Sequence, residues 1–313
     1  MRLIKEKTNI DFLSLGRRRI ALVFSAILII ASLTSLTTRG LNFGIDFTGG
    51  ILLEVGYPQA ADLEQIRGSL QAAGFTDLQV QQFGPPTDVL LRLPPQAEGT
   101  NPDDIRNLLE STLQQDEPNV VIRRLEFVGP QVGEELTEKG GLSMIFALLM
   151  IFAYVMFRFQ WKFSAGAVAA LAHDVIVTVG FFSIFQLPFD LTVVAAVLAV
   201  IGYSLNDTVV AFDRIRENFI SLRGVTSEEA MNTSINEMLA RTIITGVTTL
   251  LVLVALLTLG GESVGPFSIA LIVGIVIGTY SSIYTASAIA LTLNVNAQDL
   301  LPPESDEPID EMP

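Results

Sequence analysis

Six long apolar runs divide this sequence, and they constrain its fold more than any other feature. Each run has at least 17 predominantly apolar residues, which is enough for an α-helix to cross the hydrocarbon core of a bilayer. The first two runs are 17 residues long, near the lower limit for a span. The sequence therefore predicts a polytopic α-helical membrane protein with six transmembrane helices. The predicted spans are 20–36, 141–157, 163–187, 191–212, 242–259 and 267–293.

The first run could instead be the core of a signal peptide, because Arg17, Arg18 and Arg19 precede it as a basic region would. No clear cleavage site with small residues follows the run. We therefore expect 20–36 to be retained as a membrane anchor.

Composition agrees with a membrane protein and excludes several kinds of site. Half of the 313 residues are hydrophobic, and the net charge of −14 argues against binding to nucleic acid. The chain has no cysteine, which excludes disulfides, thiol catalysis and iron–sulfur clusters. Its single histidine excludes any metal site that needs two imidazoles. We expect no metal and no cofactor.

The basic residues indicate an orientation in the membrane. Residues 1–19 carry six of the nineteen Lys and Arg, and the connections 158–162 and 213–240 carry two and three more. The two short connections on the other side carry none. Because cytoplasmic loops are enriched in Lys and Arg, both termini are predicted to be cytoplasmic. The long segment 37–140 then lies outside the cytoplasm.

Segment 37–140 has the pattern of a folded α+β domain. Two stretches with helical spacing, 60–73 and 102–113, are separated by strand-like stretches and turn residues. The predicted order β-α-β-β-α-β is the ferredoxin-like split motif. The predicted organisation is a cytoplasmic segment 1–19, a first span 20–36, an extracytoplasmic ferredoxin-like domain 37–140, a five-helix bundle 141–293 and an acidic cytoplasmic tail 294–313.

Asp207 is the strongest candidate for a functional residue, because it lies inside the apolar run 191–212. A carboxylate within a bilayer costs several kcal/mol unless it is paired, hydrated or protonated, and such residues commonly relay protons or ions. The alternative is that Asp207 is a buried structural carboxylate that only stabilises a contact between two helices. Arg241 lies at a similar depth and is the expected partner, although it could instead snorkel to the interface. The position of Arg241 before Thr242 and before a polar stripe of Thr245, Thr248 and Thr249 favours an inward-facing Arg241.

Three further polar residues lie within the predicted spans. His173 and Asp174 sit near the middle of 163–187, where they could relay protons or form a structural hydrogen-bonded pair. Asn206 could bond across helices or solvate a proton path. These three residues are secondary candidates.

A cluster of glycines follows the first predicted span. The stretch 44–50 includes Asp46, Gly49 and Gly50, but no Lys-Ser or Lys-Thr pair follows, which argues against a phosphate-binding loop. We expect a tight turn at which the extracytoplasmic domain meets the membrane.

Six motifs stand out along the chain: Gly44-Ile-Asp-Phe-Thr-Gly-Gly50, Gly129-Pro-Gln-Val-Gly133, His173-Asp174, Gly202-Tyr-Ser-Leu-Asn-Asp207, Phe212-Asp-Arg-Ile-Arg-Glu-Asn218 and Arg241-Thr242. Together they resemble the SecF family, membrane subunits of the bacterial protein-export machinery related to SecD. The resemblance covers nearly the whole chain. It implies the membrane fold of the resistance–nodulation–division superfamily and a non-enzymatic role in preprotein export driven by the proton-motive force.

The resemblance also implies partners, a location and residue roles. It implies SecD, the SecYEG channel, YajC and YidC, the translocating preprotein and membrane lipid as partners, and no nucleic acid. It places the chain in the cell inner membrane, or in the thylakoid membrane of a photosynthetic organism. It assigns a proton-pathway role to Asp207 and Arg241.

Two other functions remain open. An exporter of small molecules or lipids from the same superfamily would normally have twelve spans and two large outer domains, which this chain lacks. An intramembrane aspartyl protease could use Asp174 and Asp207, but neither residue lies in a Gly-x-Gly-Asp motif.

Overall fold

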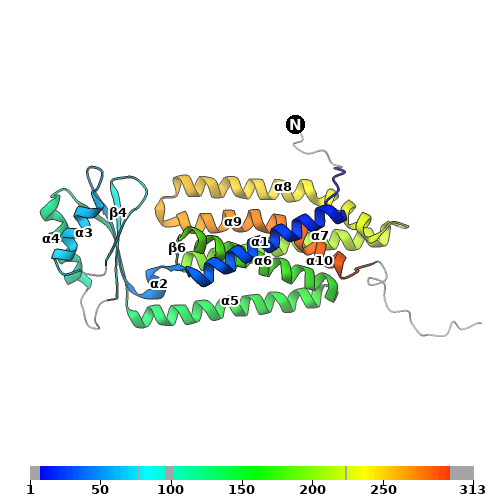
Figure 1. Cartoon of the computed structure of the whole chain (residues 1–313), viewed down its shortest axis with the longest axis horizontal. Helices are drawn as coiled ribbons and strands as arrows, with labels where there is room; N and C mark the ends of the chain where they lie inside the picture. The colour runs from blue at the N-terminus through cyan, green and yellow to red at the C-terminus, as the bar shows by residue number, and fades with distance from the viewer. Residues whose placement is uncertain (1–7, 76–77, 96–101, 223, 297–313) are drawn as a thin grey trace, which may run out of the picture.

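The computed structural model describes residues 8–75, 78–95, 102–222 and 224–296. A bundle of long helices forms most of the molecule, and a smaller domain built on a β-sheet lies at one end of it (Figure 1). We call this smaller part, residues 50–128, the sheet domain. The acidic tail from residue 297 onward lies outside the described residues.

Among the described residues, six helices are long and apolar enough to cross a membrane, which confirms the number of predicted spans. The last of them continues through a π-helical segment, Ser282–Ala286, into α10, Ser287–Thr292. The six helices are α1 (Leu15–Thr38), α5 (Pro130–Arg158), α6 (Trp161–Phe185), α7 (Leu191–Ser221), α8 (Ser227–Leu259) and the one that begins with α9 (Gly265–Ser281).

These helices extend beyond the apolar runs from which they were predicted. The helix α8 begins fifteen residues before Thr242, at a capping box in which Thr226 and Glu229 exchange hydrogen bonds. Backbone hydrogen bonding continues along a helix whether its side chains are apolar or polar, so a helix need not end where the apolar residues end. Polar helical turns therefore extend the bundle at its ends.

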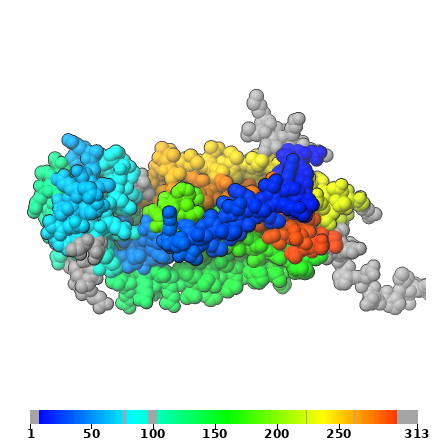
Figure 2. Space-filling model, viewed as in Figure 1, coloured from blue at the N-terminus to red at the C-terminus, as the bar shows by residue number. Residues whose placement is uncertain are grey.

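The helix α7 lies at the centre of the bundle and packs against α6, α8 and α9. The helix α1 packs along α6 and crosses the front of the bundle, whereas α5 forms one long edge (Figures 1 and 2). The helices α5 and α8 bury the smallest shares of their apolar windows. They therefore present the largest apolar surfaces outward.

The sheet domain contains four antiparallel strands in the order β3-β4-β2-β5. Its helices α3 and α4 pack on one face, around a core that includes Leu53, Leu70, Leu91 and Leu109. The sheet lies between these helices and the bundle (Figure 1). Its elements are β2 (Gly50–Gly56), α3 (Leu63–Ala72), β3 (Gln79–Gln82), β4 (Asp88–Leu93), α4 (Pro102–Asp116) and β5 (Val121–Val128).

A short segment joins the bundle to the sheet domain. The two-residue strand β1, Asn42–Phe43, pairs in parallel with β6, Pro188–Phe189, and the short helix α2, Ile45–Thr48, follows it. Gly49 and Gly50 then have φ angles of 68° and 121°. Residues with a Cβ atom rarely adopt these angles, whereas glycine adopts them readily. The expected tight turn is present at this junction.

At the opposite end of the bundle, residues 8–13 form an arm that lies along α8. The side chain of Asn236 accepts a hydrogen bond from Ile10 N at 2.8 Å and donates one to Ile10 O at 2.7 Å. Asn232 Oδ1 accepts from Phe12 N at 2.7 Å. Phe12 and Leu13 are buried in the core of the bundle. Two asparagine amides therefore hold the backbone of the arm as a neighbouring strand would.

Candidate functional site

Asp207 is buried within α7, with 6% of its surface exposed. Its Oδ2 atom has no hydrogen-bond partner among the described residues. Arg241, on the neighbouring α8, acts on Asp207 electrostatically. Within the described part of the chain, no ion pair of 4.0 Å or less joins the two side chains. The structure therefore places the two candidates on helices that pack together, without an ion pair between these two described side chains.

Two of the three threonines in the expected inward stripe, Thr245 and Thr248, face outward from this chain, and Thr249 is half-buried. Thr245 and Thr248 are exposed, and their hydroxyls donate to carbonyl groups of their own helix. Thr242 is buried instead. The helix α8 lies at the periphery and packs mainly on α7 and α9. Arg241 is also exposed, so a polar strip of Arg241, Thr245 and Thr248 lies on the outer surface of a membrane helix.

His173 and Asp174 belong to a buried cluster that joins three helices. Asp174 Oδ1 contacts His173 Nδ1 at 2.9 Å. Asp174 Oδ2 accepts hydrogen bonds from Ser204 Oγ of α7 at 2.5 Å and from Ser281 Oγ of α9 at 2.7 Å. We call these four residues the Asp174 cluster. Both oxygens of Asp174 have partners, whereas His173 Nε2 has none among the described residues.

One face of α7 connects the Asp174 cluster to Asp207. Ser204, Asp207 and Thr208 are spaced at i, i+3 and i+4, so they lie on the same side of the helix. Thr208 Oγ1 bonds to Ser282 Oγ of the π-helical segment at 2.8 Å. Asp207 therefore borders a continuous layer of hydroxyl groups between α7 and the last span.

Two glycines of α9 allow this close approach. A Cβ atom on Gly274 would lie 2.2 Å from Val200 Cγ2, and one on Gly278 would lie 3.0 Å from Ser204 Cβ. Small residues of this kind let membrane helices pack closely. The π-helical segment Ser282–Ala286 follows directly, and π-helical turns often occur at functional sites.

Sequence reasoning did not identify Ser204, Thr208, Ser281 and Ser282 as members of a polar site. Serines beside glycines in an apolar helix are equally typical of close helix packing. The available signal was the spacing of Ser204 and Thr208 around Asp207. Asn206 is exposed on another face of α7 and does not join the Asp174 cluster.

The two intramembrane carboxyl groups therefore differ in what they can do chemically. Asp174 is saturated by three polar neighbours, which suits a group that fixes helix positions. Asp207 has a buried oxygen with no described partner, and such a group can accept a proton or a hydrogen bond from water. The described residues contain no cluster of three or more His, Asp or Glu that could hold a metal.

A second candidate region lies where the sheet domain meets the bundle. Asp46 Oδ2, from α2, accepts a hydrogen bond from Leu191 N, the first residue of α7, at 2.9 Å. Asp190, the N-cap of α7, accepts from Val193 N at 2.9 Å. Two carboxylates thus satisfy backbone N–H groups that lack partners at a helix start.

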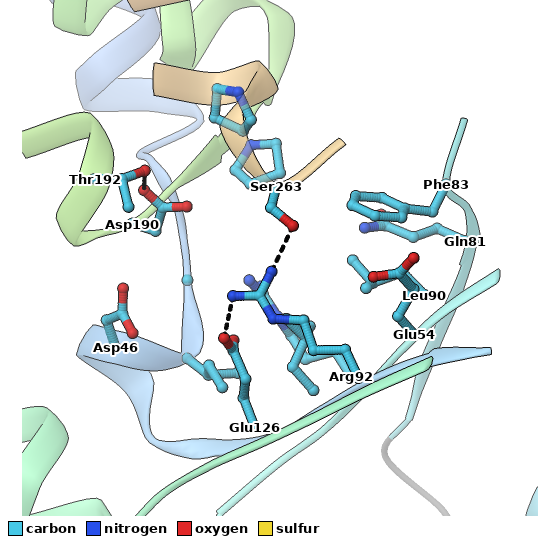
Figure 3. A pocket seen from close by; sticks show the side chains of 16 residues that line it. Asp46, Glu54, Gln81, Phe83, Leu90, Arg92, Glu126, Asp190, Thr192 and Ser263 are labelled. Atoms are coloured by element: carbon cyan, nitrogen blue, oxygen red, sulfur yellow. Dashed lines mark hydrogen bonds and ion pairs between the residues drawn. The ribbon is translucent and has the colours of Figure 1, made fainter. Parts of the chain in front are cut away.

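A cavity of about 230 Å³ lies beside these carboxylates, between the open face of the sheet and the bundle. Asp46 and Asp190 lie on its bundle side, and Arg92 and Glu126 project from the sheet (Figure 3). Arg92 donates to Asn42 Oδ1 at 3.3 Å. Burial lowers the pKa of Arg92, and the carboxylates of Asp190 and Asp46 oppose that change.

Comparison with known proteins relates this chain to one family. The family described as "Protein export membrane protein SecD/SecF, C-terminal" matches residues 108–296, and the SecD/SecF GG motif matches residues 34–61. The Protein translocase subunit SecF of Pseudomonas aeruginosa is 49% identical, over 96% of this chain and 97% of the relative. The protein of the same name from Vibrio alginolyticus is 47% identical, over 99% of each chain.

Solved structures of SecDF are also similar. The crystal structure of SecDF from Thermus thermophilus has a TM-score of 0.84 and 35% identity, covering 93% of this chain. A structure of SecDF in a super-membrane-facing form has a TM-score of 0.68 and covers 94% of this chain. This chain spans 40% of the length of each SecDF chain.

Proposed function

The chain belongs to the SecD/SecF family of protein-export membrane proteins, and on this premise we propose that it works with a SecD subunit and uses the proton-motive force to promote late steps of preprotein export. Its curated relatives are translocase subunits, and it is a Sec protein-translocation subunit of their kind. The energy source and the partner are the parts that we propose.

The observation that carries the proton-driven mechanism is the buried Oδ2 atom of Asp207, which has no hydrogen-bond partner in the described part of the chain. When ionised, Asp207 attracts Arg241 and holds α7 and α8 together. When protonated, it loses most of that attraction, and the two helices can separate. Because Asp207 borders the hydroxyl layer between α7 and α9, its protonation can also alter the packing of those helices.

The outward polar strip of Arg241, Thr245 and Thr248 supports SecD as the partner. An arginine and two threonines facing lipid are unfavourable, so a second membrane subunit covering α8 would stabilise them. This chain spans 40% of the length of the SecDF chain. The remaining length is consistent with a SecD part that lies alongside the part similar to this chain. SecYEG, YajC, YidC and the preprotein are further partners in this proposal, in contact with membrane lipid.

The proposal places the sheet domain outside the cytoplasm, as a ferredoxin-like domain, with both termini in the cytoplasm and the bundle in the inner membrane. The strand order β3-β4-β2-β5 and the two helices on one face support this domain type. The basic residues of the N-terminal segment support the orientation.

His173, Asp174 and Asn206 remain secondary members of the proposed proton path. The unpartnered Nε2 of His173 supports a polar connection from the Asp174 cluster. Asn206 could contribute from the exposed side of α7. The saturation of Asp174 argues against the protease alternative, because a protease dyad needs two carboxyl groups that share one proton.

The test is export of a preprotein into membrane vesicles, with and without a proton gradient. Asp207→Asn keeps the size of the side chain but cannot cycle a proton, so it should abolish the gradient-dependent part of export. Arg241→Met should have nearly the same effect, and the double variant should be little worse, because both residues act in one step.

Asp213→Asn is the matched control, because Asp213 is an exposed carboxylate of the same helix that pairs with Arg158. It should retain gradient stimulation. The amount of co-purified SecD must be equal in all variants. Gradient stimulation at the unmodified level in Asp207→Asn would rule out the proposed mechanism.

A further inference from the structure

The start of α7 is held by two carboxylates of different origin. Asp190 directly precedes the helix, and its Oδ1 accepts from Val193 N at 2.9 Å and from Thr192 Oγ1 at 2.6 Å. Asp46 lies 145 residues away in sequence and accepts from Leu191 N at 2.9 Å. Negative groups are favoured at a helix N-terminus, both by hydrogen bonding and by the helix dipole. Asp46 thus caps α7 from another part of the chain.

The short helix α2 that carries Asp46 is fixed on two sides. On one side, Gly44 N donates to Phe189 O at 2.8 Å, next to the β1–β6 pair. On the other side, α5 packs so closely that a Cβ atom on Gly133 would lie 2.8 Å from Gly49 N. Thr137 Oγ1 of α5 also donates to Phe47 O at 3.3 Å. The helix α2 therefore cannot shift independently of its neighbours.

The same segment leads directly into the middle of the sheet. Only three residues separate Asp46 from Gly50, the first residue of β2, and β2 pairs with both β4 and β5. A Cβ atom on Gly50 would lie 2.4 Å from Leu93 O, so the chain is tightly packed where it enters the sheet. A displacement of Asp46 would therefore be transmitted to the central strand β2 with little loss of amplitude.

Asp207 lies on the helix that Asp46 caps. Asp207 follows Leu191 by sixteen positions, about 24 Å along a helix. A continuous α-helix transmits an axial shift or tilt over such a length.

The other contacts near the cavity are weaker links between the sheet and the bundle. Arg124 Nη1 donates to Ser263 Oγ at 2.6 Å, and the Arg92–Asn42 bond measures 3.3 Å. Arg124 is exposed, and exposed polar pairs contribute little to stability. The cavity beneath the open face of the sheet leaves room for the sheet domain to tilt (Figure 3).

We propose that Asp46 is a positioning residue that couples α7 to the sheet domain, so that movement of the helix carrying Asp207 is transmitted through α2 and Gly49-Gly50 to the central strand. This inference rests on the proposed function, because it takes proton binding at Asp207 as the event that moves α7. The inference identifies the residue that transmits this movement from α7 to the sheet domain.

The test measures the position of the sheet domain directly. The chain has no cysteine, so spin labels can be attached at Ser111→Cys in α4 and Phe185→Cys at the end of α6, both exposed positions. Pulsed electron paramagnetic resonance on the purified complex in lipid nanodiscs gives the distance distribution between them. Asp207→Asn serves as a permanently uncharged form.

Asp207→Asn should change the distance distribution when Asp46 is present and should leave it unchanged in the Asp46→Ala background. Asp46→Asn retains an acceptor oxygen for Leu191 N and should preserve the change. Asp190→Ala is the matched control, because it removes a cap of the same helix without cutting the link to α2, and the change should persist. Asp46→Ala should have a melting temperature similar to that of Asp190→Ala and retain its partner subunits.

A change that persists undiminished in Asp46→Ala would overturn the role of Asp46 and leave the proposed function standing. If the change is also lost in Asp190→Ala, the specific role of Asp46 is overturned, because any weakening of the start of α7 would then abolish the change. If Asp207→Asn changes nothing in any background, the proposed movement of α7 is absent, and both proposals fail.

Discussion

Replacing Gly274 with alanine should separate α7 from the last membrane helix. A Cβ atom at this position would lie 2.2 Å from Val200 Cγ2 and 2.6 Å from Val200 Cγ1. Carbon atoms in contact lie about 3.5–4.0 Å apart, so the helices must separate by about 1.3 Å. Val200 cannot turn aside easily, because a valine in a helix has one strongly preferred rotamer.

The cost can be estimated from the contacts near this point. Overpacking of a filled core costs about 1–3 kcal/mol. The separation would also lengthen the Thr208–Ser282 bond, now 2.8 Å, and strain the bonds of Ser204 and Ser281 to Asp174. Hydrogen bonds between membrane helices are worth about 0.6 kcal/mol each. Alanine regains about 1 kcal/mol through its higher helix propensity, so the net loss should be about 1–3 kcal/mol.

The assay is thermal unfolding of the purified protein in a mild detergent, where we expect the melting temperature to fall by roughly 2–5 °C. Val200→Ala removes the two methyl groups that obstruct the new Cβ, so the double variant Val200→Ala/Gly274→Ala should recover most of the loss relative to Val200→Ala alone. Gly202→Ala is the matched control, because no atom lies within 4 Å of its added Cβ. The reasoning fails if Gly274→Ala melts like Gly202→Ala, or if removal of the Val200 methyl groups brings no recovery.

Three further predictions concern other parts of the chain. For the proposed orientation, Ser111→Cys in α4 should react with an impermeant thiol reagent added to intact cells, whereas Val225→Cys, before α8, should not; the reverse pattern would invert the topology. Burial, with smaller contributions from Asp116 and Glu117, raises the pKa of Tyr57 to about 12. Because the pKa of an unfolded tyrosine is about 10, the stability of the sheet domain should fall between about pH 10 and 12. Tyr57→Phe should abolish that fall when the free energy of unfolding is measured against pH. Asn236→Ala should speed hydrogen exchange at Ile10 N by roughly 5- to 150-fold, for a lost bond of about 1–3 kcal/mol, whereas Asn232→Ala should act mainly on Phe12 N; equal effects on both amides from either change would contradict the assignment of the two bonds.

The membrane spans could be predicted from the sequence because bilayer thickness sets the length of an apolar run. Asp207 could be singled out for the same reason, since a carboxylate is conspicuous among apolar residues. The ends of the helices could not be predicted, because polar residues continue the backbone hydrogen bonding of α7 and α8 beyond the apolar runs.

The orientation of a polar face could not be read from the sequence. A stripe such as Thr245 and Thr248 can face the centre of its own bundle or another subunit, and both environments shield it from lipid. The Asp174 cluster and the Asp46 bond were also hidden. They depend on contacts across 107 and 145 residues, and a serine or an aspartate carries no local mark of such a partner.

The arm formed by residues 8–13 has a consequence for the biosynthesis of the chain. Asn236, which binds the backbone of the arm, lies 226 residues further along the sequence than Ile10. At about 5–20 residues per second, the ribosome synthesises Asn236 roughly 10–45 s after the arm. During this interval Phe12 and Leu13 have no completed core to enter. The docking of the arm is therefore a late step, and a docked arm marks a nascent chain whose α8 has already been synthesised.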